Sequence, residues 1–147
     1  MQTRLQQFTI RAAVEDDVPL ILSFIKSLAE YEKLSHEVVA TEADLRQFLF
    51  GSRPMAEAIL GYWSVEAVSF ALFFHNFSTF LGRPGLYLED LFVKEEMRGR
   101  GIGRLMLAYL AQEARKRECG RLEWSVLDWN SPARGFYQSL GAISMDE

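Results

Sequence analysis

Apolar residues recur along this chain in two spacings, one typical of strands and the other typical of helices. Short apolar runs, some of them alternating with polar residues, are separated by turn-forming residues and predict strands. The predicted strands cover Phe8 to Ala13, Ala56 to Trp63, Ala67 to Phe77, Leu86 to Val93 and Leu122 to Leu127. Residues 81–85, Leu-Gly-Arg-Pro-Gly, are expected to form a turn before the fourth of these strands.

Apolar positions three and four residues apart predict four helices between the strands. Thr41 and Asp44 resemble a capping box at the start of the second helix, and Ile102 begins the clearest amphipathic pattern. The predicted helices run from Asp16 to the region of Tyr31 to Leu34, from Thr41 to Phe50, from Ile102 to about Cys119, and from Pro132 to Gly141.

The order of these elements predicts the fold class. A strand, two helices and three consecutive strands are followed by helix, strand and helix, which favours a mixed α/β domain around one central sheet. No linker divides the 147 residues, so we expect residues 1–147 to form a single domain. Because the chain stops at Glu147, at most a short last strand is expected. The sequence leaves open whether the chain is truncated or a partner covers that sheet edge.

Composition and charge exclude several classes of function. The formal net charge of −4 argues against a general nucleic-acid binder, which needs a basic surface. A single cysteine, Cys119, excludes an intrachain disulfide framework and a cysteine-based zinc cluster. No run of about 18 apolar residues predicts a membrane span, and the polar N-terminus does not resemble a secretory signal. These features favour a cytoplasmic protein.

Residues 98–103, Arg-Gly-Arg-Gly-Ile-Gly, lie between a predicted strand and a predicted helix. A dinucleotide-binding fingerprint needs a glycine where Arg104 stands, and no Lys-Ser or Lys-Thr follows to complete a P-loop. The spacing Arg-x-x-Gly-x-Gly does fit an anion cradle, because glycines let free N–H groups at a helix start approach a phosphate. The alternative is a basic turn that only caps the helix.

The blocks around this motif identify a family. In order along the chain, "LAEYEKL", "TEADL", "LYLEDLFV", "RGRGIG" and "DWNSPARGFYQSLGA" resemble blocks of the GCN5-related N-acetyltransferase (GNAT) superfamily, and in particular its diamine (spermidine/spermine or thialysine) acetyltransferases. The resemblance covers about Thr9 to Ala142. It implies a central sheet with one splayed strand pair, acetyl-CoA as co-substrate, no metal, and a homodimer.

The resemblance also implies which residues hold the coenzyme. The main chain of Leu91, Phe92 and Val93 would pair with the pantetheine arm, and the glycine-rich loop would receive the pyrophosphate through its main-chain N–H groups. Asn130 would contact the coenzyme beyond the next strand, although helix capping explains this residue type equally well. The coenzyme-binding set is therefore Leu91, Phe92, Val93, Arg98, Gly99, Arg100, Gly101, Ile102, Gly103, Arg104, Asn130, Ser131, Pro132, Ala133 and Tyr137.

Two residues are expected to carry the chemistry. Glu89 and Asp90 interrupt an apolar strand, so simple alternation cannot hide both from the core. In the family, the glutamate at the position of Glu89 binds the substrate ammonium and helps to deprotonate it, whereas Asp90 is expected to make a structural hydrogen bond. Tyr137 matches the tyrosine that protonates the leaving thiolate. From spacing alone, Tyr137 would be interpreted as a packing residue.

The resemblance places further residues on the substrate side: Tyr31, Glu32, Glu123, Trp124 and Ser125. The hairpin with Ser78 and Phe80 departs from the family's pattern, so a second anchor for a long polyamine is not expected. The predicted activity is acetyl transfer to the primary amine of a small polyamine, diamine or amino-acid analogue, by direct attack in a ternary complex. The alternatives are a protein lysine or N-terminal acetyltransferase, and a non-catalytic coenzyme A-binding module.

Overall fold

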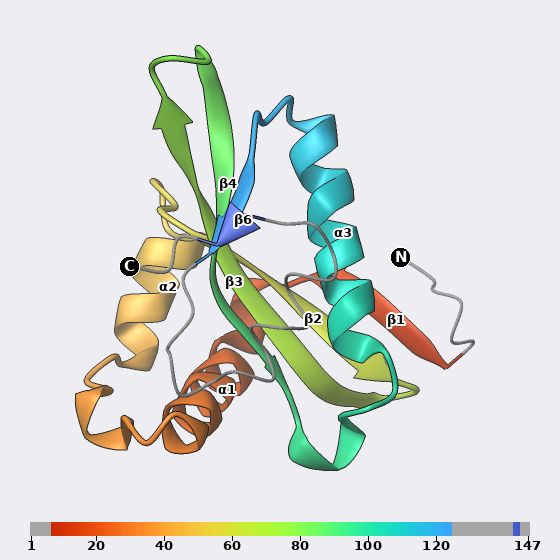
Figure 1. The fold of residues 1–147 in the computed structure, drawn as a ribbon. Coiled ribbons are helices and arrows are strands. Elements are labelled where there is room, and N and C mark those ends of the chain that lie inside the picture. The colour runs from red at the N-terminus through yellow and green to blue at the C-terminus, as the bar shows by residue number, and fades with distance from the viewer. Residues whose placement is uncertain (1–6, 125–142, 145–147) are drawn as a thin grey trace.

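The computed structural model describes residues 7–124 and 143–144, and its strands form one mixed sheet (Figure 1). The strands stand in the sheet in chain order: β1 Phe8–Ala12, β2 Glu57–Trp63, β3 Glu66–Ser78, β4 Arg83–Val93, β5 Leu122–Trp124 and β6 Ile143–Ser144. Strands β1 to β4 are antiparallel neighbours, whereas β5 is parallel to both β4 and β6. The predicted mixed α/β fold is confirmed, and β6 has only two residues.

The helices begin and end close to where the sequence predicts. They are α1 Val18–Tyr31, α2 Glu42–Phe50 and α3 Ile102–Lys116, with single 3₁₀ turns at Glu15–Asp17, Ser35–Glu37 and Glu95–Met97. The capping box is confirmed: the Asp44 N–H donates to Thr41 Oγ1 at 3.1 Å, and the Thr41 N–H donates to Asp44 Oδ2 at 3.0 Å. The predicted fourth helix lies outside the described residues.

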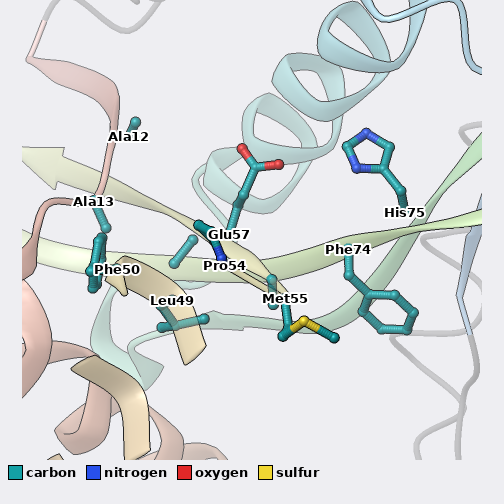
Figure 2. Close-up of a pocket in the computed structure, with 11 residues that line it drawn as sticks. Ala12, Ala13, Leu49, Phe50, Pro54, Met55, Glu57, Phe74 and His75 are labelled. Atoms are coloured by element: carbon teal, nitrogen blue, oxygen red, sulfur yellow. The ribbon is translucent and has the colours of Figure 1, made fainter. Parts of the chain in front are cut away.

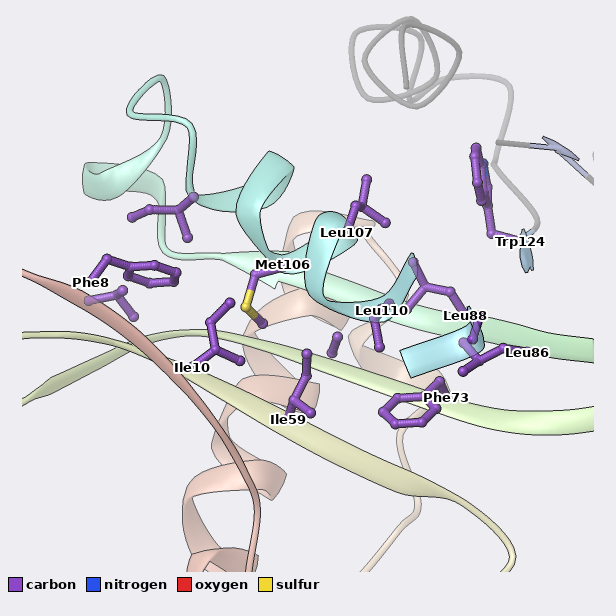
Figure 3. Close-up of a cluster of buried hydrophobic side chains, with 14 residues drawn as sticks. Phe8, Ile10, Ile59, Phe73, Leu86, Leu88, Met106, Leu107, Leu110 and Trp124 are labelled. Atoms are coloured by element: carbon purple, nitrogen blue, oxygen red, sulfur yellow. The ribbon is translucent and has the colours of Figure 1, made fainter. Parts of the chain in front are cut away.

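Helices cover both faces of the sheet and bury one apolar cluster on each (Figure 1). On one face, Leu107, Met106 and Leu110 of α3 pack on the strands, together with Phe73 of β3 (Figure 3). On the other face, α1 and α2 bury a second cluster that includes Phe24, whose ring stacks on Phe70 with centroids 5.4 Å apart. Each Å² of apolar surface that is buried contributes about 25 cal/mol to stability, so the clusters on both faces stabilise the sheet.

The predicted turn over residues 81–85 is correct only for its first two residues, because the turn covers residues 79–82 and β4 already begins at Arg83, which pairs with Ser78 of β3. Pro84 is tolerated inside the strand because of the direction its main chain faces. The Pro84 carbonyl accepts from the Gly120 N–H at 2.8 Å, on the side of β4 away from β3. The N–H that proline lacks would face that same side, so no β3–β4 hydrogen bond is lost.

In the part of the chain described by the structure, no helix has both the length and the apolar character needed to cross a membrane. Over the same residues, no group of three or more His, Cys, Asp or Glu side chains is arranged to hold a metal ion.

Candidate active site

A β-bulge in β4 places the two consecutive carboxylates of this strand. Leu72 of β3 pairs with Asp90, but the next residue, Phe73, pairs with Leu88, so Glu89 is an extra residue in β4. Before the bulge, Leu88 faces the α3 side of the sheet, and after it Phe92 faces the α1 side. The change of register places both Glu89 and Asp90 on the face covered by α1 and α2. The bulge was not predicted from the sequence, although two adjacent carboxylates in an apolar strand could have indicated it.

Glu32, which follows α1, lies near these two residues and completes what we call the acidic cluster: Glu32, Glu89 and Asp90. Glu89 is exposed, whereas Glu32 and Asp90 are half-buried. Burial, followed by the charges of Glu89 and Glu32, raises the pKa of Asp90 from 3.8 to about 7. Burial, followed by the charge of Glu89, also raises the pKa of Glu32. The acidic cluster therefore favours binding of a cation or a proton.

The cluster partly agrees with the sequence-based assignments. Glu32 and Glu89 were both expected on the substrate side, and the structure brings them together although 57 positions separate them in the numbering, from 32 to 89. Asp90 was expected to have a structural role, but it lies in the same cluster, and its pKa is raised to about 7. A carboxylate with a pKa near the working pH is suited to accept a proton.

The glycine-rich loop has the backbone conformation that an anion cradle requires. Gly99 and Gly101 have φ angles of +82° and +86°, a region that residues with a Cβ rarely adopt. No heavy atom of the described residues lies within 4 Å of where a Cβ would stand at either glycine. The first hydrogen bond into α3 runs from the Leu105 N–H to the Gly101 carbonyl at 3.1 Å. The N–H groups of Ile102 and Gly103 precede that bond and have no acceptor within the helix.

These features fit a pyrophosphate group. Open space beside both glycines allows a phosphate to approach the main chain, and the dipole of α3 favours a negative charge there. Arg100 and Arg104, also predicted coenzyme contacts, belong to the same loop and the first turn of α3. The guanidinium of Arg100 lies over the Trp63 ring, 5.5 Å from its centroid.

Arg98 is directed away from the glycine-rich loop. Its Nε–H donates to the Val93 carbonyl at 2.9 Å, and its guanidinium lies 4.4 Å from the centroid of the Tyr31 ring and 5.4 Å from that of Phe92. Tyr31 is the last residue of α1. The first arginine of the motif therefore connects the coenzyme loop with the helix that carries the predicted substrate-side residues.

The end of β4 presents main-chain groups in two directions. The Lys94 N–H donates to the Val68 carbonyl of β3 at 2.9 Å, so the N–H and carbonyl groups of Val93 and, two residues earlier, Leu91 face away from β3. The Phe92 carbonyl faces β3, where it accepts from Ser69 Oγ at 2.8 Å. Of the three residues predicted to pair with an extended ligand, Leu91 and Val93 have main-chain groups directed outward.

Residues of β5 that were predicted to contact substrate are buried. Glu123 is 4% exposed, accepts from Asn76 Nδ2 at 3.3 Å, and forms an ion pair with Arg121 at 3.5 Å. Trp124 belongs to the apolar cluster on the α3 side. The remaining predicted site residues lie outside the described residues: Ser125, Asn130, Ser131, Pro132, Ala133 and Tyr137.

A cavity of about 370 Å³ lies elsewhere, between the end of α2 and the start of β2 (Figure 2). Leu49, Met55 and Phe74 form apolar walls, with Glu57 and His75 on its polar side. None of the predicted site residues lines it. We therefore assign the candidate active site to the acidic cluster and the glycine-rich loop, where the charge and the backbone conformation suit specific ligand groups.

Known proteins of one family are similar to this chain over most of its length. The sequence model of the acetyltransferase (GNAT) family matches residues 24–142. The chain is 40% identical to thialysine N-epsilon-acetyltransferase of Bos taurus, over 94% of this chain and 85% of that protein. It is 32% identical to L-ornithine N5-acetyltransferase NATA1 of Arabidopsis thaliana, over 90% of this chain and 78% of that protein.

Solved structures are similar over comparable lengths. An integron cassette protein from V. cholerae superposes with a TM-score of 0.75 at 28% identity, covering 92% of this chain and 85% of that one. An aminoglycoside acetyltransferase from an uncultured soil metagenomic sample reaches a TM-score of 0.80 at 15% identity, covering 93% and 89%. The second similarity concerns the fold alone.

Proposed function

The chain belongs to the acetyltransferase (GNAT) family and is an N-acetyltransferase, and we propose that it transfers the acetyl group of acetyl-CoA to the primary amine of a small diamine, polyamine or amino-acid analogue. The observation that carries this proposal is the acidic cluster on the α1 side of the β4 bulge. An alkyl ammonium is mostly protonated at neutral pH, and three neighbouring carboxyl groups favour its binding.

Separate sets of residues are proposed to hold the coenzyme and to return a proton to its sulfur. Acetyl-CoA supplies the activated acyl group. Main-chain N–H groups of Gly99 to Gly103 hold its pyrophosphate. The outward main-chain groups of Leu91 and the N–H of Val93, whose carbonyl already accepts from Arg98, hold its pantetheine arm. Residues 130–133 are proposed as further coenzyme contacts, and Tyr137 as the donor that returns a proton to the thiolate sulfur.

The acidic cluster positions and deprotonates the amine. Only the free base has the lone pair that attacks the thioester carbonyl, so a proton must leave the ammonium before the N–C bond forms and the C–S bond breaks. Glu89 is the exposed member and is proposed to bind the ammonium and accept its proton, directly or through water. Asp90 is a second candidate acceptor, because its pKa of about 7 is matched to neutral pH.

The names of two relatives suggest the size of the acceptor. Thialysine and ornithine are both amino acids with a primary amine at the end of a short chain. A long polyamine would need a second anionic anchor in the β3–β4 hairpin. Phe77 and Phe80, which are exposed there, carry no charge. We therefore propose that small amino-acid amines are better acceptors than spermidine. The single domain over residues 1–147, a homodimer and a cytoplasmic location are proposed with this function from the family resemblance.

A thiol-release assay with acetyl-CoA tests the proposal. Thialysine, ornithine, spermidine, and a lysine-containing peptide would each be titrated, with coenzyme A binding measured in parallel by calorimetry. We expect thialysine or ornithine to give the highest kcat/KM. Release only with the peptide would favour a protein acetyltransferase. Coenzyme A binding without release by any amine would favour a non-catalytic module, and no binding at all would contradict the proposal.

A further inference from the structure

The side chain of Arg98 joins three segments that are separate in the sequence. Its Nε–H donates to the Val93 carbonyl at 2.9 Å at the end of β4. Its guanidinium lies over two rings, Tyr31 at 4.4 Å and Phe92 at 5.4 Å from the centroids. Its own backbone immediately precedes Gly99 of the glycine-rich loop. We call this set of contacts the Arg98 clasp: Arg98, Tyr31, Phe92 and the Val93 carbonyl.

The clasp is well defined in orientation. A planar guanidinium stacks on aromatic faces, and this attraction strengthens where the groups are partly removed from water. The hydrogen bond from Nε fixes the side chain at its inner end, so the guanidinium cannot swing freely about the stem. Phe92 is buried against α1 and supports the guanidinium from β4. A clasp of this geometry restrains Tyr31 relative to the coenzyme loop.

Main-chain hydrogen bonds at the end of α1 hold Glu32, a member of the acidic cluster, next to Tyr31. The Glu32 N–H donates to the Leu28 carbonyl at 2.9 Å, and the Leu34 N–H donates to the Ala29 carbonyl at 2.7 Å. Lys33 takes a φ of +61°, which turns the chain at the helix end. Glu32 is therefore held rigidly to Tyr31, and its charge acts on Glu89 and Asp90.

We propose that Arg98 is a positioning residue that couples coenzyme binding to the placement of the amine-binding carboxylates, by clasping Tyr31 at the end of α1. The proposal rests on the proposed function, since it assigns the coenzyme to the glycine-rich loop and the amine to the acidic cluster. Coupling between two binding sites is reciprocal. Removal of the Tyr31 ring, on the α1 side, therefore weakens coenzyme binding. Removal of the Arg98 guanidinium, on the loop side, raises the KM for the amine.

Calorimetry with coenzyme A as the probe, without amine, tests the first half of this coupling. Tyr31→Leu removes the ring but leaves the glycine-rich loop unchanged, and we expect its Kd for coenzyme A to rise about two- to fivefold, the range of one exposed cation–π contact. Tyr31→Phe keeps the ring and should bind within twofold of the wild type. Tyr62→Leu is the matched control, because Arg11 lies 5.0 Å from the Tyr62 ring centroid in a contact of the same kind that shares no residue with the clasp. That variant should bind coenzyme A as the wild type does.

A double-mutant cycle tests whether Arg98 and Tyr31 act through their mutual contact or independently of each other. In an Arg98→Met background, Tyr31→Leu should cause no further loss of coenzyme A affinity, because the contact is already absent. With thialysine as the amine, Arg98→Met should raise its KM, while Tyr62→Leu, which lies outside the clasp, leaves KM and kcat unchanged. Circular dichroism would establish that each variant is folded.

The outcomes distinguish this proposal from the proposed function. Wild-type affinity for coenzyme A in Tyr31→Leu would overturn the clasp while leaving the acetyltransferase proposal intact. Equal losses from Tyr31→Leu in the wild-type and Arg98→Met backgrounds would do the same. A wild-type protein that binds no coenzyme A would instead overturn the proposed function, and the coupling with it.

Discussion

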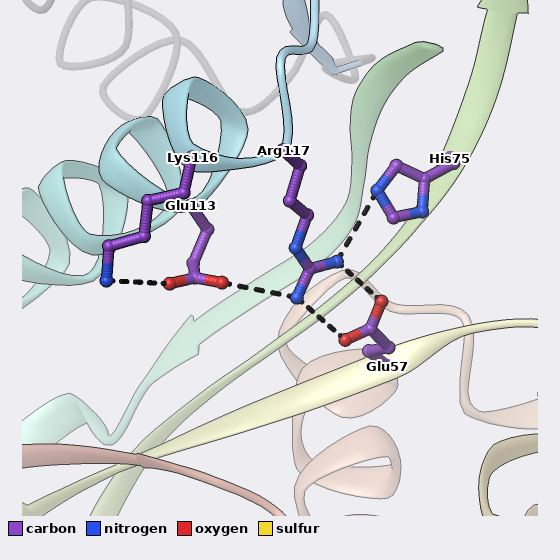
Figure 4. Close-up of polar contacts among 5 residues, drawn as sticks. All are labelled: Glu57, His75, Glu113, Lys116 and Arg117. Carbon is purple, nitrogen blue, oxygen red and sulfur yellow. Dashed lines mark hydrogen bonds and ion pairs between the residues drawn. The ribbon is translucent and has the colours of Figure 1, made fainter.

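The guanidinium of Arg117 and the carboxylate of Glu57 form a two-pronged ion pair, with Nη1–Oε2 at 2.6 Å and Nη2–Oε1 at 2.9 Å (Figure 4). Arg117 follows α3, and Glu57 is the first residue of β2. Arg117 also donates to Glu113 Oε1 at 3.2 Å and lies 3.4 Å from His75 Nε2. This network attaches the C-terminal end of α3 to the sheet, at the opposite end of the helix from the glycine-rich loop.

Removing that attachment should reduce stability but not ligand binding. Arg117→Met is expected to lower the free energy of unfolding by about 1 kcal/mol, a value limited by the partial exposure of both side chains. Urea denaturation would measure the loss. Glu118→Gln, whose partner Arg83 is 3.7 Å away at the surface, should change stability much less. An Arg117→Met protein that loses coenzyme A affinity while remaining folded would contradict the separation of the two helix ends.

The glycine-rich loop can be tested with alanine substitutions that carry equal backbone strain. Gly101→Ala should lower stability by about 1 kcal/mol because its φ is +86°. It should also raise the Kd for coenzyme A about tenfold, because the new methyl group would occupy the open space proposed for the pyrophosphate. The control is Gly82→Ala in the β3–β4 hairpin, where φ is +65° and the space around a Cβ is equally open.

The two glycine variants should lose similar stability, as measured by thermal unfolding. Only Gly101→Ala should bind coenzyme A more weakly. Equal affinity in both proteins would place the pyrophosphate elsewhere, and the loop would then be interpreted as a helix cap.

The elements of the fold could be predicted because local signals agreed with tertiary packing. The box of Thr41 and Asp44 starts α2 as expected, and the apolar pattern from Ile102 matches the buried face of α3. The turn before β4 was misplaced, since the side of the strand that Pro84 faces depends on pairing with β3 and the Gly120 segment. Such directions follow from neighbouring strands and not from the local sequence.

The candidate site could be predicted only in part, because some of its features also depend on neighbouring strands. The glycine spacing predicted a loop open to an anion, and the positive φ angles of Gly99 and Gly101 fit such a loop, because local conformation determines them. The bulge at Glu89 depends on the register between β3 and β4, so the sequence could not show that Asp90 shares its face. The contact of Arg98 with Tyr31 joins residues far apart in the chain, and no local pattern encodes it.

Asp90 should make stability depend on pH. Its pKa is raised from 3.8 to about 7, so between these pH values the folded state binds more protons than the unfolded state. The associated stability is complete below pH 4 or so and is lost as the pH rises towards about 7. Asp90→Asn removes this dependence. Relative to the wild type, the variant should gain on the order of 2 kcal/mol between pH 5 and pH 8, measured by urea denaturation at both values. Parallel pH profiles of the two proteins would contradict the raised pKa.

Tyr137 is proposed to protonate the leaving sulfur, and the phenol can be removed with little change in shape. Tyr137→Phe should lower kcat about 100- to 10,000-fold, the range of a general acid, while the Kd for coenzyme A changes less than twofold. Tyr109→Phe, on half-buried Tyr109 of α3, is the control and should keep wild-type kcat. Unchanged turnover in Tyr137→Phe would remove Tyr137 from the mechanism.

The pH profile of kcat/KM can assign the proton acceptor within the acidic cluster. If Asp90 accepts the proton, activity falls as the pH drops through about 7, because the protonated carboxyl can no longer act as a base. Glu89→Gln and Glu32→Gln each remove a charge that raises the pKa of Asp90, so each should move this acidic limb to lower pH. The shift should be larger for Glu89→Gln, whose charge has the larger effect of the two.

Asp90→Asn is the decisive variant in this series, with thialysine as the amine and thiol release as the measurement. It should abolish the limb near pH 7 and lower kcat/KM at neutral pH at least tenfold. A limb that persists in Asp90→Asn but disappears in Glu89→Gln would assign the base to Glu89, the residue indicated by the family resemblance. Either outcome is compatible with the bulge, because it brings the two carboxylates to the same face of β4, where burial raises the pKa of Asp90.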